Sequence, residues 1–526
     1  MTQAERTWAI NKKAELLKDT EGFGRRAFLK QMATVAGSAR FAPSLAPSLA
    51  PVLIGGAAAS LDAAAASAQA PAARAHQENN HETERLAAYA AAVRFEELPP
   101  VVLQRAKDCL TDTVAAIIYG AELPWSKMII AYAQKNSAPG KSYILGSGGA
   151  PVHAGAAALS NGAMTHAFEL DNLTKPDSGS HPGATVFSAA LAVAQERGLS
   201  GRDLLAGFVA GTETMIRIGH ATKHTNEARG FHAPGTTGPF GAAAATGRLL
   251  KLDAGKMTNA LGVAGSCASG LLEFAHAGNG AMVKRLHMGR AAEAGVLAAS
   301  LAAEGFTGPT SVLEGEAGFL RVYCTDWDVA ELTHGLGTTY FVLDIMLKRY
   351  ACHITAHNPV EALLDLRNEH KFTAADVASI DVAGNERMAK TNNIPAPADM
   401  MLAQYSIPFS VALALYRDPV DPRSFDEGVV HDRAILDMSS RIKMPIVPGQ
   451  DRRDLAATVT VRLKDGREFS RKVTSFKGTP ERPLAQPELK GKFMLLTKRI
   501  GRDKAEPLFD RLQHIENETS LDWLNV

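Results

Sequence analysis

Cysteine is scarce in this chain of 526 residues, and its four cysteines lie far apart. No two of them form a Cys-x-x-Cys pair, so neither a zinc knuckle nor a redox pair is predicted, and each cysteine should pack as a small apolar side chain. Basic and acidic residues balance to a net charge of +1, which argues against a nucleic-acid partner. No apolar run reaches the roughly 18 residues of a membrane span, so no membrane partner is predicted.

The motifs of common cofactor sites are also missing. The chain has no P-loop, no GxGxxG, no nucleophile elbow and no HExxH, so no cofactor is predicted. The nearest spacing to a metal site is that of His353 and His357, which would share one face of a helix, but no motif supplies an acidic third ligand. We therefore predict no metal and interpret this pair as an imidazole surface that binds substrate or pairs with carboxylates.

Small residues and helical periodicity are abundant, whereas aromatic residues make up only 6%. Apolar positions recur at three- and four-residue steps over residues 83–343 and again over 486–526, which predicts one large all-helical domain. Residues 344–485 between them mix helices with strands and predict a smaller inserted α+β domain. The predicted fold class is therefore mainly α. Helices expected in the first part include Ala154–Phe168, Gly241–Leu250, Ala291–Glu304 and Pro309–Phe319. The strands are expected at Val377–Gly384, Ser439–Pro448 and Ala457–Phe476, the last as a hairpin turning at Asp465-Gly466.

The first 70 residues resemble a twin-arginine export signal. Arg25-Arg26 is followed by Phe28-Leu29-Lys30, an alanine-rich tract comes next, and Ala68-Gln69-Ala70 fits a small-residue cleavage site. We predict export to the periplasm, with a cytoplasmic protein carrying a basic N-terminal arm as the alternative.

Residues 161–186 gather the side chains that best suit acid–base chemistry. Glu169, Asp171, Asn172 and Asp177 precede His181, and the pattern predicts a helix, a loop broken by proline and glycine, and a second helix. A histidine at a helix entry beside clustered carboxylates is suited to proton transfer near neutral pH. The alternative is a solvated connection.

Cationic and imidazole groups stand ahead of two further helices. Lys284 and His287 lie in a basic run before a helix expected from about Gly289, where a cation opposes the helix dipole unless an anion is bound. His232 lies in the glycine- and proline-rich stretch 230–238, which predicts a tight loop ahead of a helix from Gly241. Free N–H groups at such a helix start bind carboxylates. These features indicate a polycarboxylate ligand.

Five stretches in order resemble the MmgE/PrpD family, which includes 2-methylcitrate dehydratases, cis-aconitate decarboxylases and an iminodisuccinate epimerase. They are residues 161–186, 230–253, 281–309, 313–320 and 347–363. The resemblance implies that the smaller domain forms a lid, that the site lies between the two domains, and that the protein is a homodimer.

The resemblance also implies the roles of individual residues. His181, Glu169, Lys284 and Tyr405 match catalytic positions, and Asp171, His232, Lys348 and His287 are expected to bind substrate. The alternatives are a buried structural histidine for His181, a solvent histidine for His232, a surface lysine for Lys348 and a core aromatic for Tyr405. Asn172 stands where the family often has a second aspartate, which puts any role for two adjacent charges in doubt, and Thr174 is a candidate for the family's threonine.

The expected function is that of a cofactor-independent lyase or isomerase acting on a small di- or tricarboxylate. Dehydration, decarboxylation and epimerisation all pass through a carbanion-like intermediate next to a carboxylate. The run His181-Pro182-Gly183 departs from the HPSDNLG-like run of the methylcitrate dehydratases, which favours the branch with the decarboxylase and the epimerase. The alternative is an exported carboxylate-binding protein of the same fold without catalysis.

Overall fold

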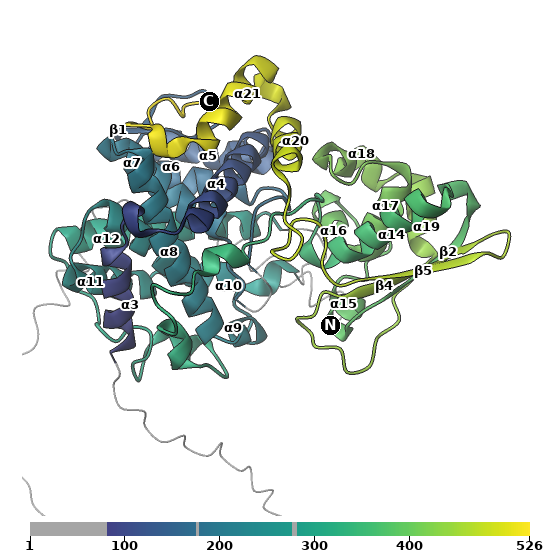
Figure 1. The fold of residues 1–526 in the computed structure, drawn as a ribbon, viewed down its shortest axis with the longest axis horizontal. Helices are drawn as coiled ribbons and strands as arrows, with labels where there is room; N and C mark the ends of the chain where they lie inside the picture. Colours follow the sequence, from purple (N-terminus) through teal and green to yellow (C-terminus); the bar gives the residue numbers. More distant parts are fainter. Residues whose placement is uncertain (1–80, 175–177, 276–280) are drawn as a thin grey trace, which may run out of the picture. The chain divides into compact units, whose positions relative to one another are not determined.

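The computed structural model describes residues 81–174, 178–275 and 281–526 (Figure 1). The predicted export segment and Asp177 lie outside these residues, and export therefore stays a prediction. The described residues all belong to one compact unit.

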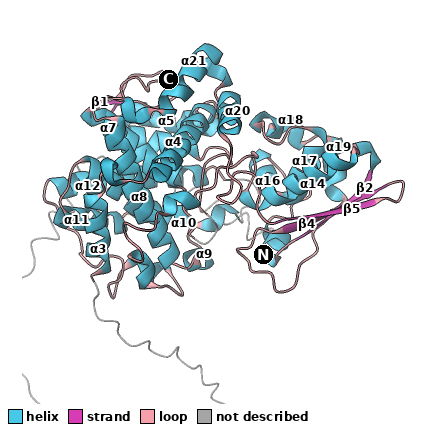
Figure 2. Cartoon of the chain, viewed as in Figure 1, coloured by secondary structure: helices cyan, strands magenta, loops and turns pink. Residues whose placement is uncertain are grey.

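The described chain is mainly helical with one small sheet (Figure 2), which confirms the predicted fold class at that level. The division into domains and the lid stay predictions. The helices before residue 330 are α3 (Glu82–Ala92), α4 (Pro100–Gly120), α5 (Pro124–Asn136), α6 (Ala154–Thr165), α7 (Ser188–Arg197), α8 (Gly201–Ala221), α9 (Thr225–Ala228), α10 (Ala233–Leu249), α11 (Ala254–Gly265), α12 (Val283–Ala303) and α13 (Phe319–Tyr323). The later helices are α14 (His357–His370), α15 (Glu386–Thr391), α16 (Met400–Tyr405), α17 (Ile407–Tyr416), α18 (Glu427–Val430), α19 (Arg433–Ser440), α20 (Gln486–Leu496) and α21 (Arg502–Gln513).

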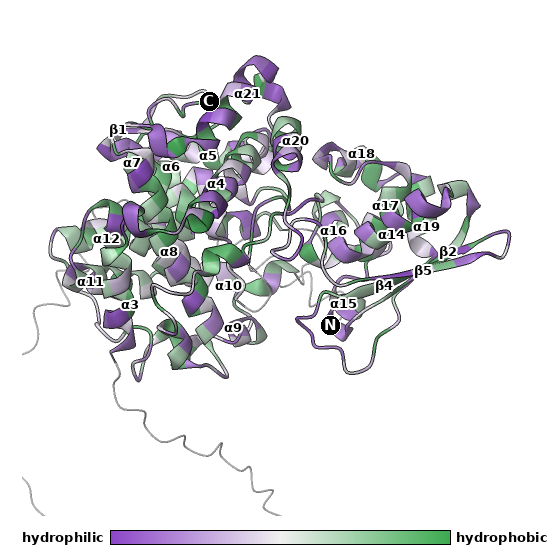
Figure 3. Ribbon diagram, viewed as in Figure 1, coloured by the Kyte–Doolittle hydropathy of each residue, from purple (hydrophilic) through white to green (hydrophobic). Residues whose placement is uncertain are grey.

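Small residues let the central helices approach closely. Helix α10 packs against α8 and α12, and α12 also packs against α6. A Cβ at Gly289 of α12 would lie 2.1 Å from the carbonyl oxygen of Leu159 in α6, so only glycine fits there. Outer helices such as α21 instead carry many hydrophilic residues (Figure 3). The many alanine and glycine residues of the sequence thus allow the helices to pack densely.

The C-terminal helices α20 and α21 pack against α4, although almost 400 residues separate them in the sequence. Lys492 of α20 reaches the buried Asp112 of α4 at 2.5 Å and also donates to the carbonyl of Leu170 at 2.9 Å. The end of the chain is thereby tied to the segment that carries Glu169 and Asp171.

The sheet has the strand order β3-β2-β4-β5, with β2 and β3 parallel and the other pairs antiparallel. Its strands are β2 (Val377–Ala383), β3 (Ile442–Lys443), β4 (Ala457–Leu463) and β5 (Glu468–Val473), and a separate short strand β1 spans Pro139–Ser142. Every second residue of β4 is buried, because α14 packs against β4 and β5. The predicted hairpin at Asp465-Gly466 is confirmed, and Gly466 takes the positive φ of 88° that such a turn needs.

Several predicted boundaries are wrong. The strand expected at Ser439–Pro448 shrinks to β3, because α19 continues to Ser440 and Pro445 has no N–H to donate. Helix α10 begins at Ala233 rather than at Gly241, since Pro234 is tolerated in a first helical turn. Helix α12 begins at Val283 rather than near Gly289 or Ala291. The helix expected over Pro309–Phe319 is replaced by turns in a segment that contains two glycines.

The four cysteines are free, and three of them are buried, as their expected apolar role requires. Within the described ranges, no single helix is long and apolar enough to cross a membrane. The pair α4 and α5 passes that test only together, and it bends by 94°.

Candidate active site

A cavity of about 270 Å³ brings together most of the predicted site residues. Those that line it are Glu169, His181, His232, Lys284, Lys348 and Tyr405. Asp171 and His287 do not line it, and their roles in binding substrate stay predictions. Both lie behind the wall, where each touches a histidine that does line the cavity.

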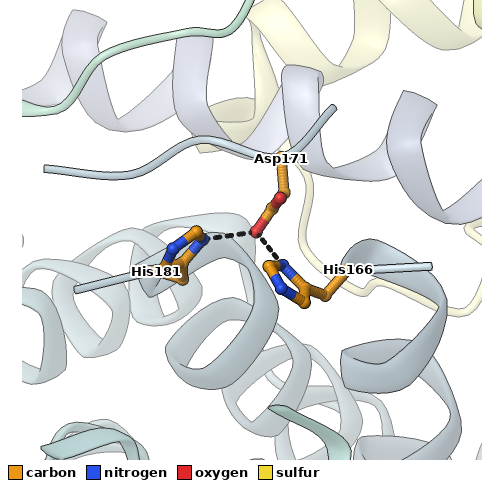
Figure 4. A group of neighbouring side chains, drawn as sticks. All are labelled: His166, Asp171 and His181. Carbon is orange, nitrogen blue, oxygen red and sulfur yellow. Dashed lines mark hydrogen bonds and ion pairs between the residues drawn. The ribbon is translucent and has the colours of Figure 1, made fainter. Parts of the chain in front are cut away.

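Asp171 holds two imidazoles with one oxygen. Its Oδ2 lies 2.7 Å from Nδ1 of His181 and 2.9 Å from Nδ1 of His166 (Figure 4). A carboxylate only accepts hydrogen bonds, so each ring must donate from Nδ1, and each neutral ring then keeps an acceptor at Nε2. Of the two histidines only His181 lines the cavity.

The charge states of this trio follow from their burial and contacts. Burial opposes ionisation of Asp171, but the two imidazoles outweigh it and hold its pKa well below the usual range. Burial lowers the pKa of His166 to about 3, with Asp171 opposing that shift, so His166 is neutral at neutral pH. Asp171 is therefore a buried anion that accepts a hydrogen bond from His181.

Asn172 fixes the backbone on both sides of this trio. Its amide donates to Oγ1 of Thr113 at 2.9 Å and to the carbonyl of Cys109 at 3.2 Å, both in α4, and its oxygen accepts from the N–H of Gly183 at 3.1 Å. Gly183 begins a π-helical turn directly after His181 and Pro182. Asn172 thus has a structural role that explains why an amide stands beside Asp171.

Glu169 forms ion pairs with both predicted lysines. Its two oxygens contact Nζ of Lys284 and, at 2.6 Å, Nζ of Lys348, and all three side chains are buried. Burial opposes ionisation of Glu169, yet the two lysines hold its pKa well below the usual range. Lys284 lies in the first turn of α12, so the anion expected beside it is in part supplied by the protein itself.

Tyr405 ends α16 and faces the same lysine. Nζ of Lys284 lies 4.7 Å from the centre of its ring, and the ring stacks on that of His353 at 4.7 Å. Burial raises the pKa of Tyr405 well above its ordinary value, so its hydroxyl stays protonated and can donate a hydrogen bond. His353 also lines the cavity.

The metal-like spacing of His353 and His357 does not place them on one helical face. Helix α14 begins at His357, which is buried with Nε2 3.2 Å from the carbonyl of Cys352, whereas His353 precedes the helix and faces the cavity. Among the described residues, the nitrogen and oxygen atoms of His166, Asp171 and His181 are close enough to hold an ion. Hydrogen bonds from two N–H groups to one oxygen account for this closeness.

His232 directly precedes α10 and lies beside His287, with their Nδ1 atoms 3.1 Å apart. Burial lowers the pKa of His232 well below its ordinary value, and the nearby Lys284 adds to this shift. His232 is therefore a neutral group at the cavity wall. Thr174 also lines the cavity, although its hydroxyl is hydrogen-bonded to that of Ser178.

The cavity lining also includes residues that the sequence did not single out. Among them are Arg387, Arg452, Glu227 and His224. The lining contains four lysine and arginine side chains and two carboxylates. Its formal net charge is therefore +2 when the histidines are counted as neutral. The position of His166 three residues before Glu169 is a signal that the sequence offers, but no local pattern marks Arg387.

These features define a cavity with an excess of positive charge, lined by histidines, lysines, arginines and a tyrosine. The chain belongs to the MmgE/PrpD family: the model of the family's N-terminal domain matches residues 84–332, and that of its C-terminal domain matches residues 350–513. The match confirms the family predicted from the sequence.

Three curated relatives show how similar the chain is to known proteins. Human cis-aconitate decarboxylase is 27% identical over 452 residues, which cover 83% of this chain and 92% of the relative. Cis-aconitate decarboxylase of Aspergillus terreus is 32% identical over 303 residues, which cover 55% and 60% of the two chains. The cis-aconitate decarboxylase-like protein oryM of Aspergillus oryzae is 27% identical over 479 residues, or 84% of this chain and 95% of the relative.

Proposed function

We propose that this chain is a cofactor-independent MmgE/PrpD-type lyase that removes carbon dioxide from cis-aconitate or a closely similar tricarboxylate. The observation that carries the proposal is the pairing of His181 with the buried Asp171 at the wall of a cavity with an excess of positive charge. The relatives named cis-aconitate decarboxylase support decarboxylation over dehydration and epimerisation.

Lys284 and Lys348 suit the binding of the reacting end of the substrate. Each ammonium group has three N–H donors, and each contacts one oxygen of Glu169, which leaves donors for a substrate carboxylate. Glu169 holds both ammonium groups in place through ion pairs at a buried position, where a charge without a partner is unfavourable. Tyr405 adds a neutral hydrogen-bond donor beside Lys284.

The proposed reaction breaks one carbon–carboxylate bond and releases carbon dioxide. The electron pair stays on the substrate and spreads over the adjoining double bond and a remaining carboxylate, where the fixed lysines stabilise the negative charge. His181, as imidazolium, gives its Nε2 proton to carbon and completes the product. Asp171 stabilises the imidazolium before this transfer, and solvent returns a proton to His181 afterwards.

Proton NMR of the purified chain with a panel of acids tests the reaction class. The panel contains cis-aconitate, 2-methylcitrate, citrate and iminodisuccinate. Loss of one carboxylate from cis-aconitate supports the proposal. Water release from 2-methylcitrate would point to a dehydratase, and configurational exchange of iminodisuccinate without a net new product to an epimerase. Tight binding of an acid without any conversion would replace the proposal with the carboxylate-binding protein.

Export and assembly complete the proposal. We expect residues 1–70 to direct the folded enzyme to the periplasm, and a reporter protein fused to them should be found there and should stay in the cytoplasm once Arg25 and Arg26 are changed to lysine. We also expect a homodimer, which sedimentation of the purified chain would test.

A further inference from the structure

The lining of the cavity includes an arginine with no hydrogen bond to any described residue. Arg387 lies in α15, its side chain is 26% exposed, and it lines the cavity. Its nearest acid among the described residues is Glu227, whose Oε2 is 3.8 Å from Nη2, beyond hydrogen-bond distance. No described residue accepts a hydrogen bond from this guanidinium, although it has five N–H donors.

Glu227 is already engaged by another group. Its Oε2 lies 2.9 Å from Nε2 of His224, and both side chains are mostly buried. Burial opposes ionisation of Glu227, but His224 and Arg387 outweigh it and lower its pKa to about 2. Glu227 is thus a fixed anion that attracts Arg387 electrostatically. The N–H donors of Arg387 stay available to bind another oxygen.

A buried amide fixes the position of Arg387. Asn385, which is 1% exposed, caps α15 by accepting from the N–H of Met388 at 2.9 Å. Its amide nitrogen donates to the carbonyls of Asp451 and Arg452 at 3.2 Å and of Asp454 at 2.8 Å. Asn385 therefore connects the start of α15 to the loop that carries Arg452. The segments that carry the two arginines of the cavity lining, Arg387 and Arg452, are thus linked by hydrogen bonds.

We propose that Arg387 binds a second carboxylate of the substrate, other than the one that the lysines bind, and so selects acids with two or more carboxylates. This inference rests on the proposed function, because it assigns another group of the same substrate. A guanidinium can bind a carboxylate through two parallel hydrogen bonds, which fixes orientation as well as charge. A monocarboxylic acid would leave Arg387 unpaired in a half-buried place.

The test compares binding and turnover in three variants of the full chain. Arg387→Met removes the charge at similar length, and Arg387→Lys keeps the charge without the two-pronged geometry. The matched control is Lys390→Met, because Lys390 lies in the same helix, is 68% exposed and pairs only with Glu386 among the described residues. Calorimetry with propane-1,2,3-tricarboxylate, a saturated acid, gives Kd without turnover, and rates with cis-aconitate give kcat and KM.

We expect Arg387→Met to weaken binding of propane-1,2,3-tricarboxylate by about 10- to 100-fold, the usual effect of losing a charge-assisted hydrogen bond. Arg387→Lys should fall in between, Lys390→Met should match the wild type, and KM for cis-aconitate should rise far more than kcat falls. An unchanged Kd in Arg387→Met would overturn the subsite, as would an equal loss in Lys390→Met. A wild type that binds the tricarboxylate through Arg387 but converts no acid would refute the proposed reaction alone.

Discussion

Replacing Asp171 by asparagine tests how the site controls the proton on His181. The Oδ2 of Asp171 accepts from both His166 and His181 in a fully buried place. An asparagine of the same size can place its amide oxygen there and still accept from both rings, but its NH₂ group then replaces Oδ1, which lies 3.9 Å from the ammonium of Lys348. The variant also removes the negative charge that stabilises the imidazolium of His181.

The size of the effect follows from this loss. A positioned acid or base contributes about 10²- to 10⁴-fold to a rate, so we expect kcat of Asp171→Asn to fall by that range. Because Asp171 does not line the cavity, KM should change little. A change in kcat with little change in KM is the signature of an interaction that matters in the transition state.

The assay is the initial rate of carbon dioxide release from cis-aconitate over a pH series, with binding of propane-1,2,3-tricarboxylate as a check of folding. Asp108→Asn is the matched control, because its carboxylate accepts hydrogen bonds from the amides of Gln104 and Gln486 away from the cavity. A folded Asp171→Asn variant with the kcat and pH profile of the wild type would refute this reasoning.

Three further predictions concern stability. Glu169→Gln leaves two buried ammonium groups without their anion and should lower the free energy of unfolding by about 3–5 kcal/mol in urea titrations. His166 has a pKa of about 3 in the folded state and about 6.5 in the unfolded state, so between these pH values only the unfolded state binds a proton at this residue. The free energy of unfolding is therefore not reduced by this residue above pH 6.5 and falls as the pH decreases toward 3. His166→Gln should therefore flatten the curve of stability against pH in that window by up to about 1.4 kcal/mol per pH unit, and an unchanged slope would contradict the assignment. Gly289→Ala should cost about 1–3 kcal/mol in thermal unfolding, because its Cβ would strike a backbone carbonyl, whereas Gly155→Ala, with 3.7 Å to the nearest atom, should not destabilise.

The sequence was most informative where one local pattern decides the structure. The hairpin at Asp465-Gly466 follows from turn chemistry, and the helical class follows from periodicity. The start of α10 was misplaced because glycine and proline usually end helices, yet Pro234 fits a first turn and the glycines are needed for close packing against neighbouring helices. Such packing depends on contacts between distant segments, which local propensity cannot show.

In the candidate site, too, local sequence predicts some features, whereas others depend on contacts between distant segments. The local segment around Glu169 and His181 marked the acid–base groups, and the family resemblance added Lys284 and Lys348. The place of Asp171 behind the wall depends on how its loop folds back on His166 and His181. Arg387 could not be found from sequence, because it faces the cavity only through long-range contacts.

The central claim is that His181 delivers a proton to carbon after carbon dioxide leaves. The most direct measurement follows cis-aconitate labelled with ¹³C in its carboxylates in heavy water, with the wild type and His181→Ala. We expect one labelled carbon dioxide and one deuterium fixed on carbon for each product molecule, with the rate lowered by about 10²- to 10⁴-fold in His181→Ala. The proposal would be contradicted if a folded His181→Ala variant released carbon dioxide and incorporated deuterium into the product at the wild-type rate. It would also be contradicted if the wild type bound the acid without converting it.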